Sequence, residues 1–240
     1  MIGNWCTANF LTLNTSKTKL LCFKHVMPEL HLELEPQLSV RFLGLNIDPD
    51  LKFKSHIEAL NSKLASGCYA IRSTRRELGF AQARTVYFAL VESHLRFAIQ
   101  FWGACSQELF SSVFLLQKKA VRLLCQVNSR ETCKPLFIKH SILTLVSLFI
   151  LETASIIFKN KHLYENNNRS GRFASNLALI TPRSTLVKDS FIFNGIKIFN
   201  KLPSEIKNLE TIRKFRNSLD RLLAKRAYYD LTEFFEDHWS

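Results

Sequence analysis

The stretch SHIEALNSKLASGCYAIRSTRRELG, residues 55–79, decides the fold class of this 240-residue chain. Its apolar side chains recur every three or four residues, at Ile57, Leu60, Leu64, Cys68 and Ile71. That spacing puts them on one face of an α-helix, with Ser55 placed as the N-cap and Gly79 as the end. The basic residues lie mostly off that face, so the sequence predicts a helix with one buried side and one cationic side.

Two further helical patterns follow and predict a small antiparallel bundle. The second ends near Gly103 and has apolar positions at Tyr87, Leu90, Val91, His94, Ala98 and Phe101. The third opens at Ser106 and carries Leu109, Val113, Leu116, Ala120, Leu123, Leu124 and Val127. Because His94 falls on the apolar face, we expect a satisfied core histidine rather than a catalytic base. Three consecutive amphipathic helices with short joints are typical of a helix bundle.

The residues before the bundle have the composition of strands and turns. We expect short strands over residues 10–13 and 19–23, joined by a turn at 14–17. A second strand pair is expected over residues 40–47 and 51–53. Pro49 between two aspartates has strong turn chemistry, so we place the hairpin turn there. The expected fold class is therefore mainly α with a small N-terminal β part (α+β).

The residues after 128 predict a helical C-terminal region. Residues 142–158 are apolar but short for a membrane span and contain Glu152, so we expect no membrane and a buried, nearly all-apolar helix over 145–159. Residues 163–186 are rich in Asn, Ser, Arg and Pro and predict a loop. A helix is expected over 187–200, a break at 202–204, and an amphipathic helix capped by Thr211.

The charge balance points to a polyanionic partner. The chain has 33 Lys and Arg against 20 Asp and Glu, a net charge of +13. So basic a chain meets nucleic acid or an anionic membrane face, or is simply a basic soluble protein. The six cysteines are scattered without zinc-knuckle spacing, and the N-terminus has no signal-peptide pattern. We therefore expect reduced thiols in an intracellular protein, nuclear or cytoplasmic.

No catalytic constellation stands out in the sequence. There is no Asp-Asp pair, no Gly-rich phosphate loop, no serine nucleophile elbow and no His-Glu metal helix. From the residues alone we assign no catalytic residue, no metal ligand and no cofactor, and we expect the chain by itself to be inactive.

An ordered series of short segments resembles the reverse transcriptases of non-LTR retrotransposons, in particular the jockey-like group. The N-terminal part of the series is Trp5 with Asn14–Thr18, then Phe42–Asp48 with Leu51, His56 and Ile57. The series continues with Phe101–Gly103, Leu116–Arg122, Arg130-Glu131 near Cys133, Ile142–Leu145, Phe199–Pro203 and Tyr228–Phe234. Each segment alone is weak, and their shared order across nearly the whole chain carries the resemblance.

The resemblance implies a domain layout and partners. Residues 1–37 would be a palm remnant, 38–54 a primer-grip-like hairpin, 55–128 a thumb-like bundle, and 129–240 a helical C-terminal region. The partners would be an RNA template and a DNA primer, bound without sequence preference. In the family, two Mg²⁺ ions on palm carboxylates carry the phosphoryl transfer. Those carboxylates have no counterpart here, so we expect a C-terminal fragment that begins after them and has no Mg²⁺ site of its own.

The resemblance also gives candidate site residues. Lys17 matches the lysine of the palm motif thought to approach the departing pyrophosphate; a turn lysine in solvent is an equal alternative. Phe42, Leu43 and Gly44 match the primer grip, where the glycine permits close backbone approach to a nucleic-acid strand and the apolar neighbours anchor the hairpin. The alternative is an ordinary hairpin with Phe42 and Leu43 in the core, and both can hold at once. Cations expected to contact template-primer phosphates, or else to be merely solvated, are Lys52, Lys54, Lys63, Arg72, Arg75, Arg76, Lys118, Lys119, Arg122, Arg213, Lys214 and Arg216.

Two alternatives to a polymerase fragment stay open at this point. One is a non-catalytic nucleic-acid-binding remnant retained by its host for the basic bundle. The other is an expressed relic without a role.

Overall fold

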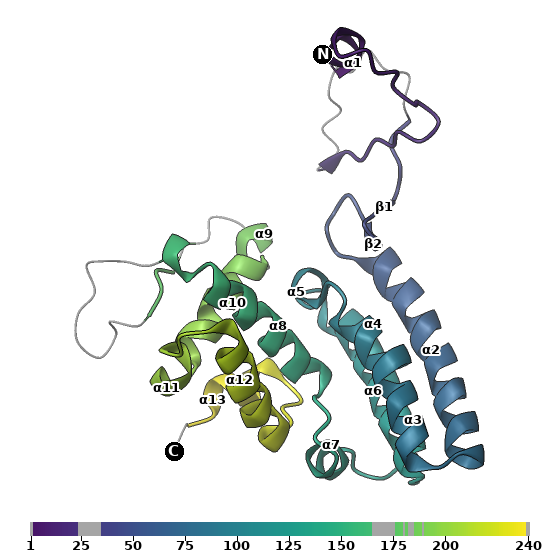
Figure 1. Cartoon of the computed structure of the whole chain (residues 1–240), viewed down its shortest axis with the longest axis vertical. Coiled ribbons are helices and arrows are strands. Elements are labelled where there is room, and N and C mark those ends of the chain that lie inside the picture. Colours follow the sequence, from purple (N-terminus) through teal and green to yellow (C-terminus); the bar gives the residue numbers. More distant parts are fainter. Residues whose placement is uncertain are drawn as a thin grey trace. The chain divides into compact units, whose positions relative to one another are not determined.

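The computed structural model describes residues 2–23, 35–164, 176–179, 181, 185–188 and 190–238. Helices dominate these residues, and their one sheet is a two-stranded antiparallel pair, which confirms a mainly α chain with a small N-terminal β part (Figure 1). The chain divides into two compact units, Met1–Glu58 and Ala59–Ser240, and each is described by itself.

The N-terminal unit lacks the two strands expected at its start. A helix, α1 (Ile2–Ala8), comes first, and the described part of residues 9–39 holds only an isolated parallel bridge between Leu20 and Pro36. The predicted strands over 10–13 and 19–23 are therefore wrong. Phe10 is 100% exposed, so the apolar side chains there gain no packing that would hold a strand in place. The predicted turn at 14–17 is confirmed, because the Asn14 Oδ1 accepts the Lys17 N–H at 3.1 Å.

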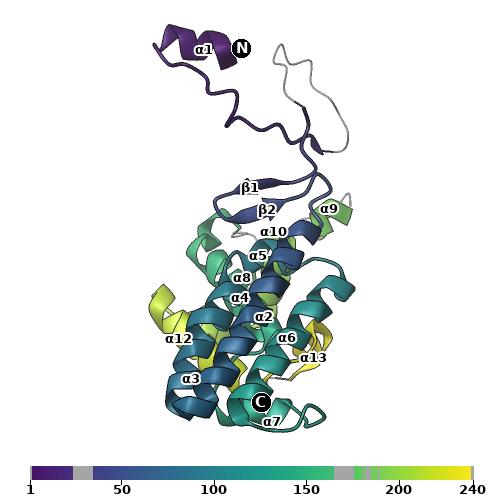
Figure 2. The ribbon, with the colours of Figure 1, turned by 90° about the vertical axis from the view of Figure 1, so that its right-hand side faces the viewer.

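A hairpin is present within residues 40–47, but the predicted partner strand over 51–53 is wrong and the hairpin turn lies elsewhere. Strand β1 (Val40–Phe42) pairs with β2 (Leu45–Ile47), with Phe42 opposite Leu45 (Figure 2). The turn is Leu43-Gly44 and not Asp48–Asp50. Both turn residues have left-handed backbones, φ 47° and 92°. Two such residues make the tight turn whose twist matches paired strands, and glycine is favoured there.

Asp48 takes part in a turn, as predicted, because its carbonyl accepts the Leu51 N–H at 3.0 Å, but it also contributes to the start of a helix. Its Oδ2 accepts the backbone N–H of Ser55 at 3.2 Å, in the first turn of α2 (Lys54–Glu77). This satisfies one of the amide groups that a helix N-terminus leaves unpaired. The sequence therefore predicted the cap at the wrong residue: Ser55 is the donor, and Asp48 provides the acceptor.

The C-terminal unit contains the three helical segments of the predicted bundle, apart from the first residues of the first helix, Lys54–Glu58. The first is α2, which ends before Gly79 as expected. The third is α6 (Gln107–Cys125), whose predicted N-cap Ser106 accepts the Leu109 N–H at 3.5 Å. Hydrogen bonds join them: Asn61 Nδ2 donates to Ser112 Oγ at 2.9 Å, and Arg75 Nε donates to the Leu124 carbonyl at 2.9 Å.

The second helix of the bundle is interrupted twice. It runs as α3 (Phe80–Tyr87), the π-helical turn η2 (Phe88–Glu92), α4 (Ser93–Arg96) and α5 (Ile99–Trp102). The wider π turn rotates the later residues, and the left-handed Ala98 (φ 54°) starts α5 in a new direction. Tyr87 and Val91 are buried as predicted, but the face then continues through Leu95, Ile99 and Trp102. His94 is therefore not a core histidine; its Nδ1 lies 2.9 Å from the Leu90 carbonyl.

Helix α8 (Leu145–Lys159) is buried, as predicted, and forms the centre of the C-terminal unit (Figure 1). Helices α4, α5, α10 (Phe191–Lys201) and α12 (Ile212–Arg226) pack against it. The buried side chain of Gln117 joins α6 to the start of α8. Its amide donates to the Leu143 carbonyl at 2.8 Å and accepts the Leu145 N–H at 2.7 Å. None of the helices in the described ranges has the length and apolar character needed to span a membrane.

Glu152, the one carboxylate inside α8, is paired. Arg216 of α12 donates two hydrogen bonds to it, at 2.7 and 2.8 Å, and Arg96 of α4 donates a third at 2.6 Å. Burial by itself raises the pKa of Glu152, but the hydrogen bonds and charges of Arg216 and Arg96 outweigh it, so the pKa lies below the ordinary value. The ion pairs therefore fasten α4 and α12 to α8.

The C-terminal helices largely follow the sequence pattern. The helix expected over 187–200 is two helices, α9 (Thr185–Lys188) and α10, because Ser190 caps the second of them. The break at 202–204 and the Thr211 cap of α12 are confirmed. The expected loop over 163–186 falls mostly outside the described residues. The remaining short helices are α7 (Lys134–Lys139), η3 (Lys161–Leu163), α11 (Ser204–Lys207) and α13 (Leu231–Glu236).

Candidate nucleic-acid interface

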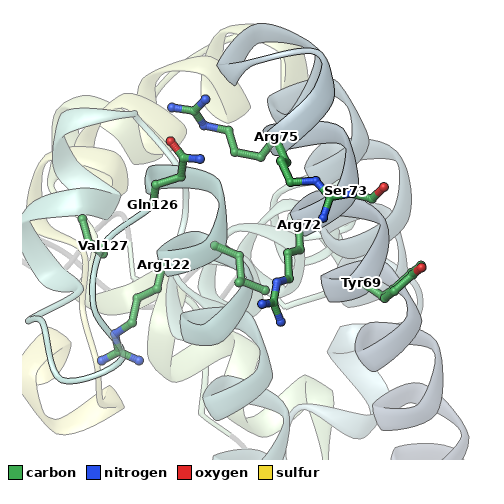
Figure 3. Close-up of a pocket in the computed structure, with 9 residues that line it drawn as sticks. Tyr69, Arg72, Ser73, Arg75, Arg122, Gln126 and Val127 are labelled. Atoms are coloured by element: carbon green, nitrogen blue, oxygen red, sulfur yellow. The ribbon is translucent and has the colours of Figure 1, made fainter.

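A groove of about 450 Å³ lies between the C-terminal half of α2 and the end of α6 (Figure 3). Arginines dominate its lining, and no carboxylate is part of it. The lining residues are Tyr69, Arg72, Ser73, Arg75, Arg76, Arg122, Leu123, Gln126 and Val127. The structure thus brings Arg122 of the third bundle helix together with the three arginines predicted on the first.

Helix geometry explains why these cations share one place. Both α2 and α6 end at the groove, with Arg75 and Arg76 in the last turn of α2 and Arg122 in the last turn of α6. The C-terminus of a helix carries partial negative charge from its unpaired carbonyls, which favours cations in the last turn. The buried Leu64, Cys68 and Ile71 form the apolar face of α2, and Arg75, four residues after Ile71, borders that face.

Two of the four guanidinium groups are held in position by the protein. Arg75 donates through Nε to the Leu124 carbonyl, and Arg122 donates through Nε to the Glu131 carbonyl, each at 2.9 Å. Among the described residues their terminal nitrogens make no hydrogen bond, although the Arg75 guanidinium lies 5.8 Å from the centre of the Phe80 ring. Arg76 pairs with Glu77 at 2.6 Å, but both side chains are more than half exposed, so water screens the pair. No hydrogen bond or ion pair of Arg72 falls within the described part of the chain, and its side chain is exposed.

The other predicted cations of the bundle differ in their surroundings. Lys63 and Lys119 are exposed to solvent. Lys118 is half-buried, and its Nζ lies 4.7 Å from the centre of the Phe114 ring and 5.6 Å from that of Tyr229. A cation over two aromatic faces is already stabilised by them. Lys118 is therefore engaged within the C-terminal unit, and Lys63 and Lys119 are available.

Helix α12 carries three predicted cations, and two of them are paired. Lys214 forms an ion pair with Glu210 at 3.0 Å on the surface. Arg216 is hydrogen-bonded to Glu152, as described above. Arg213 is exposed. The sequence pattern put all three off the apolar face, and only the tertiary structure shows that Arg216 has a carboxylate partner across the helix interface.

The candidate residues of the N-terminal unit lie on its surface. Lys17 is an exposed turn residue, and Lys52 and Lys54 are exposed near the start of α2. Phe42 is 61% and Leu43 is 83% exposed, which corrects the expectation that this pair anchors the hairpin in the core. The turn geometry is part of the reason, because Leu43 occupies the turn itself. Gly44 serves the left-handed turn.

Sequence reasoning missed Tyr69 and Gln126 as groove residues. Tyr69 lies three residues before Arg72, so both are on one face of α2. An aromatic residue off the apolar stripe and beside arginines was a signal in the sequence. Gln126 had no such signal, because its left-handed backbone (φ 54°) at the end of α6 brings it to the groove.

The metal ions implied by the resemblance would need a cluster of metal-binding side chains. Within the described ranges, no group of three or more His, Cys, Asp or Glu residues is placed to hold a metal ion.

The fold and the groove define a basic, mainly helical protein with an arginine-lined concave surface. Its sequence is similar to two transposon proteins of Drosophila melanogaster. One is a probable RNA-directed DNA polymerase from transposon X-element, 24% identical over 193 residues, which cover 76% of this chain and 20% of the relative. The other is a probable RNA-directed DNA polymerase from transposon BS, 24% identical over 134 residues, which cover 51% of this chain and 15% of the relative.

These similarities confirm the resemblance to transposon reverse transcriptases. The chain spans a fifth or less of the length of the two relatives. No protein-family model and no solved structure matches it.

Proposed function

We propose that this chain supplies template-primer binding to a non-LTR, jockey-like retrotransposon reverse transcriptase, and that the arginine groove is the main contact with the RNA–DNA duplex. The groove is the observation that supports this most directly. Four arginines from the ends of two helices converge there without a carboxylate in the lining. Phosphate oxygens need only such a cationic surface, and these contacts carry no sequence information.

The candidate residues differ in the contacts that their side chains already make within the protein, and this difference ranks them as phosphate contacts. Arg72, Arg76, Arg75 and Arg122 form the principal site, with Lys63 and Lys119 as neighbouring exposed cations on the same two helices. On α12, Arg213 is a secondary contact. Arg216 and Lys118 serve the C-terminal unit itself, because Glu152 and two aromatic rings hold them. In the N-terminal unit, the exposed Phe42 and Leu43 present a primer-grip-like tip.

Salt-dependent binding tests the proposal. If about five phosphates are neutralised, log K for an RNA–DNA duplex falls against log salt with a slope of roughly −3.5 to −4.5. The double variant Arg72→Gln, Arg76→Gln removes two cations without touching the Arg75 bond to α6. We expect it to flatten the slope by about 1.5 to 2 units with unchanged thermal unfolding. A double variant of the exposed Lys159→Gln and Lys188→Gln, which removes the same charge elsewhere, serves as the control.

Two results would overturn the binding role. One is a parental slope in the groove variant. The other is a control variant that flattens the slope as much, since the effect would then be one of net charge alone.

Primer extension tests the division between binding and chemistry. Phosphoryl transfer by this family needs metal ions held on carboxylates, and we assign no such set to this chain. We therefore expect no template-dependent product from the chain with Mg²⁺ or Mn²⁺, even at concentrations that saturate the duplex. Template-dependent extension by the purified chain, absent from the groove variant, would contradict the expectation and give the chain a catalytic role.

A further inference from the structure

Tyr69 is an exposed aromatic ring at the edge of the arginine groove. It is 76% exposed, and it lies on α2 with Arg72, Ser73 and Arg76 at positions i, i+3, i+4 and i+7. That spacing puts all four on one helix face. Figure 3 shows Tyr69 and Arg72 projecting from neighbouring turns of this helix.

The ring is available in a way that other tyrosines of the C-terminal unit are not. Tyr87 is fully buried and accepts a hydrogen bond from Gln117, and Tyr229 packs edge-on against Phe114 and Phe137. Tyr69 has no comparable ring contact within the described ranges. A single exposed aromatic residue is ordinary on a protein surface. One set beside arginines and the apolar side chains of Leu123 and Val127 has the composition of a base-stacking platform.

We infer that Tyr69 stacks on an unpaired nucleobase of a strand whose phosphates are bound by Arg72 and Arg76. The inference rests on the proposed function and adds a specific ligand to the groove, a single-stranded nucleotide next to the duplex. Inside a duplex both faces of each base are covered by neighbouring bases. A tyrosine ring therefore finds a free face only on an unpaired or terminal base, whereas arginines bind phosphates of either form.

The test compares three substrates with the full chain. They are a blunt RNA–DNA duplex, the same duplex with an unpaired RNA template overhang, and that overhang made of abasic sugars. The abasic strand keeps the phosphates and removes the bases. Affinities are measured by fluorescence anisotropy for the parent, Tyr69→Ala and Tyr69→Phe. Thermal unfolding checks the fold of each variant, which we expect to be unchanged because the Tyr69 side chain is exposed.

Tyr69→Ala is expected to weaken binding of the normal overhang roughly tenfold, as loss of one base–aromatic stack does. It leaves the blunt and abasic substrates unchanged, and the salt slope is kept because no charge is removed. Tyr69→Phe keeps the ring and the affinity. An equal effect of Tyr69→Ala on normal and abasic overhangs, or no effect on either, overturns the inference.

The outcomes separate this inference from the proposed function. Parental binding of the blunt duplex, together with no loss of overhang binding in Tyr69→Ala, leaves the proposed function standing and removes the stacking site. If the chain binds the duplex with the normal overhang but not the blunt duplex, and Tyr69→Ala weakens that binding, the stacking site stands and duplex binding by the groove is overturned. Binding of none of the three substrates overturns both.

Discussion

The two units of this chain differ in what becomes of their apolar side chains. In the C-terminal unit Trp102, Tyr87 and Phe137 are fully buried, and α8 is enclosed by neighbouring helices. In the N-terminal unit the buried side chains among the described residues are Cys6, Asp48, His56 and Ile57. Phe10, Phe42 and Leu43 are mostly exposed. The difference teaches that apolar composition buries nothing by itself, since a helix or strand needs an opposing layer to cover its apolar face.

Hydrogen exchange measures the difference in amide protection between the two units, which is the largest effect that we expect. Amides of residues 10–23 have few buried contacts around them and are expected to exchange through local opening, with free energies near zero. Amides in the bundle from Ile57 to Val127 are expected to approach the global unfolding free energy, on the order of 5 kcal/mol or more. Equal protection in the two segments would remove the distinction between the units.

The Glu152→Gln variant tests what holds the C-terminal unit together. It removes the carboxylate shared by Arg96 and Arg216, while Arg96 keeps its pair with Glu92. Because the three side chains are 18 to 35% exposed, solvent screens part of the interaction, and we expect a loss of about 1 to 2 kcal/mol. Urea unfolding at neutral pH followed by circular dichroism measures this loss. The surface pair Lys214–Glu210 provides the control, since Glu210→Gln is expected to cost at most about 0.5 kcal/mol.

The same variant carries a pH prediction. Because the pKa of Glu152 in the folded chain is lower than in the unfolded chain, its stabilisation is complete above the unfolded pKa and is lost as pH falls through the folded pKa. The difference in unfolding free energy between the parent and Glu152→Gln is therefore expected to shrink in acid. A difference that is constant from pH 7 to strong acid would show that the charge on Glu152 contributes nothing.

A pair of glycine substitutions sharpens the comparison at a smaller scale. An added Cβ at Gly103 would collide with the Phe149 ring and lie 2.5 Å from the Ile99 carbonyl oxygen, whereas one at Gly3 of α1 meets nothing within 4 Å. We expect Gly103→Ala to destabilise the C-terminal unit by about 2 kcal/mol through overpacking. Gly3→Ala is expected to be neutral or to gain up to about 1 kcal/mol of helix propensity. Equal melting temperatures for the two variants would contradict the packing difference.

The features that followed from local sequence are those that local physics decides. The helix caps at Ser106, Thr211 and the turn at Asn14 need only a side-chain oxygen and a nearby amide, and all three are present. The apolar stripe of α2 and the uniform apolar pattern of α8 likewise determine which elements lie inside. Predictions that depend on a pairing partner were wrong. The residues 10–13 and 19–23 have no partner strand among the described residues, and the hairpin turn is Leu43-Gly44 and not Asp48–Asp50.

The candidate site divides along the same line. The sequence indicated that arginines lie off the buried face of α2, because helical periodicity alone separates the two faces. The order of short segments along the sequence also indicated the similarity to transposon polymerases. Only the tertiary structure shows that Arg122 lines the same groove as Arg72 and Arg76. It also shows that Arg216 pairs with Glu152 and that Tyr69 is exposed at the groove. Those outcomes depend on contacts between residues about 50 or more positions apart, and the spacing of residues along one helix contains no information about which distant carboxylate or carbonyl it will meet.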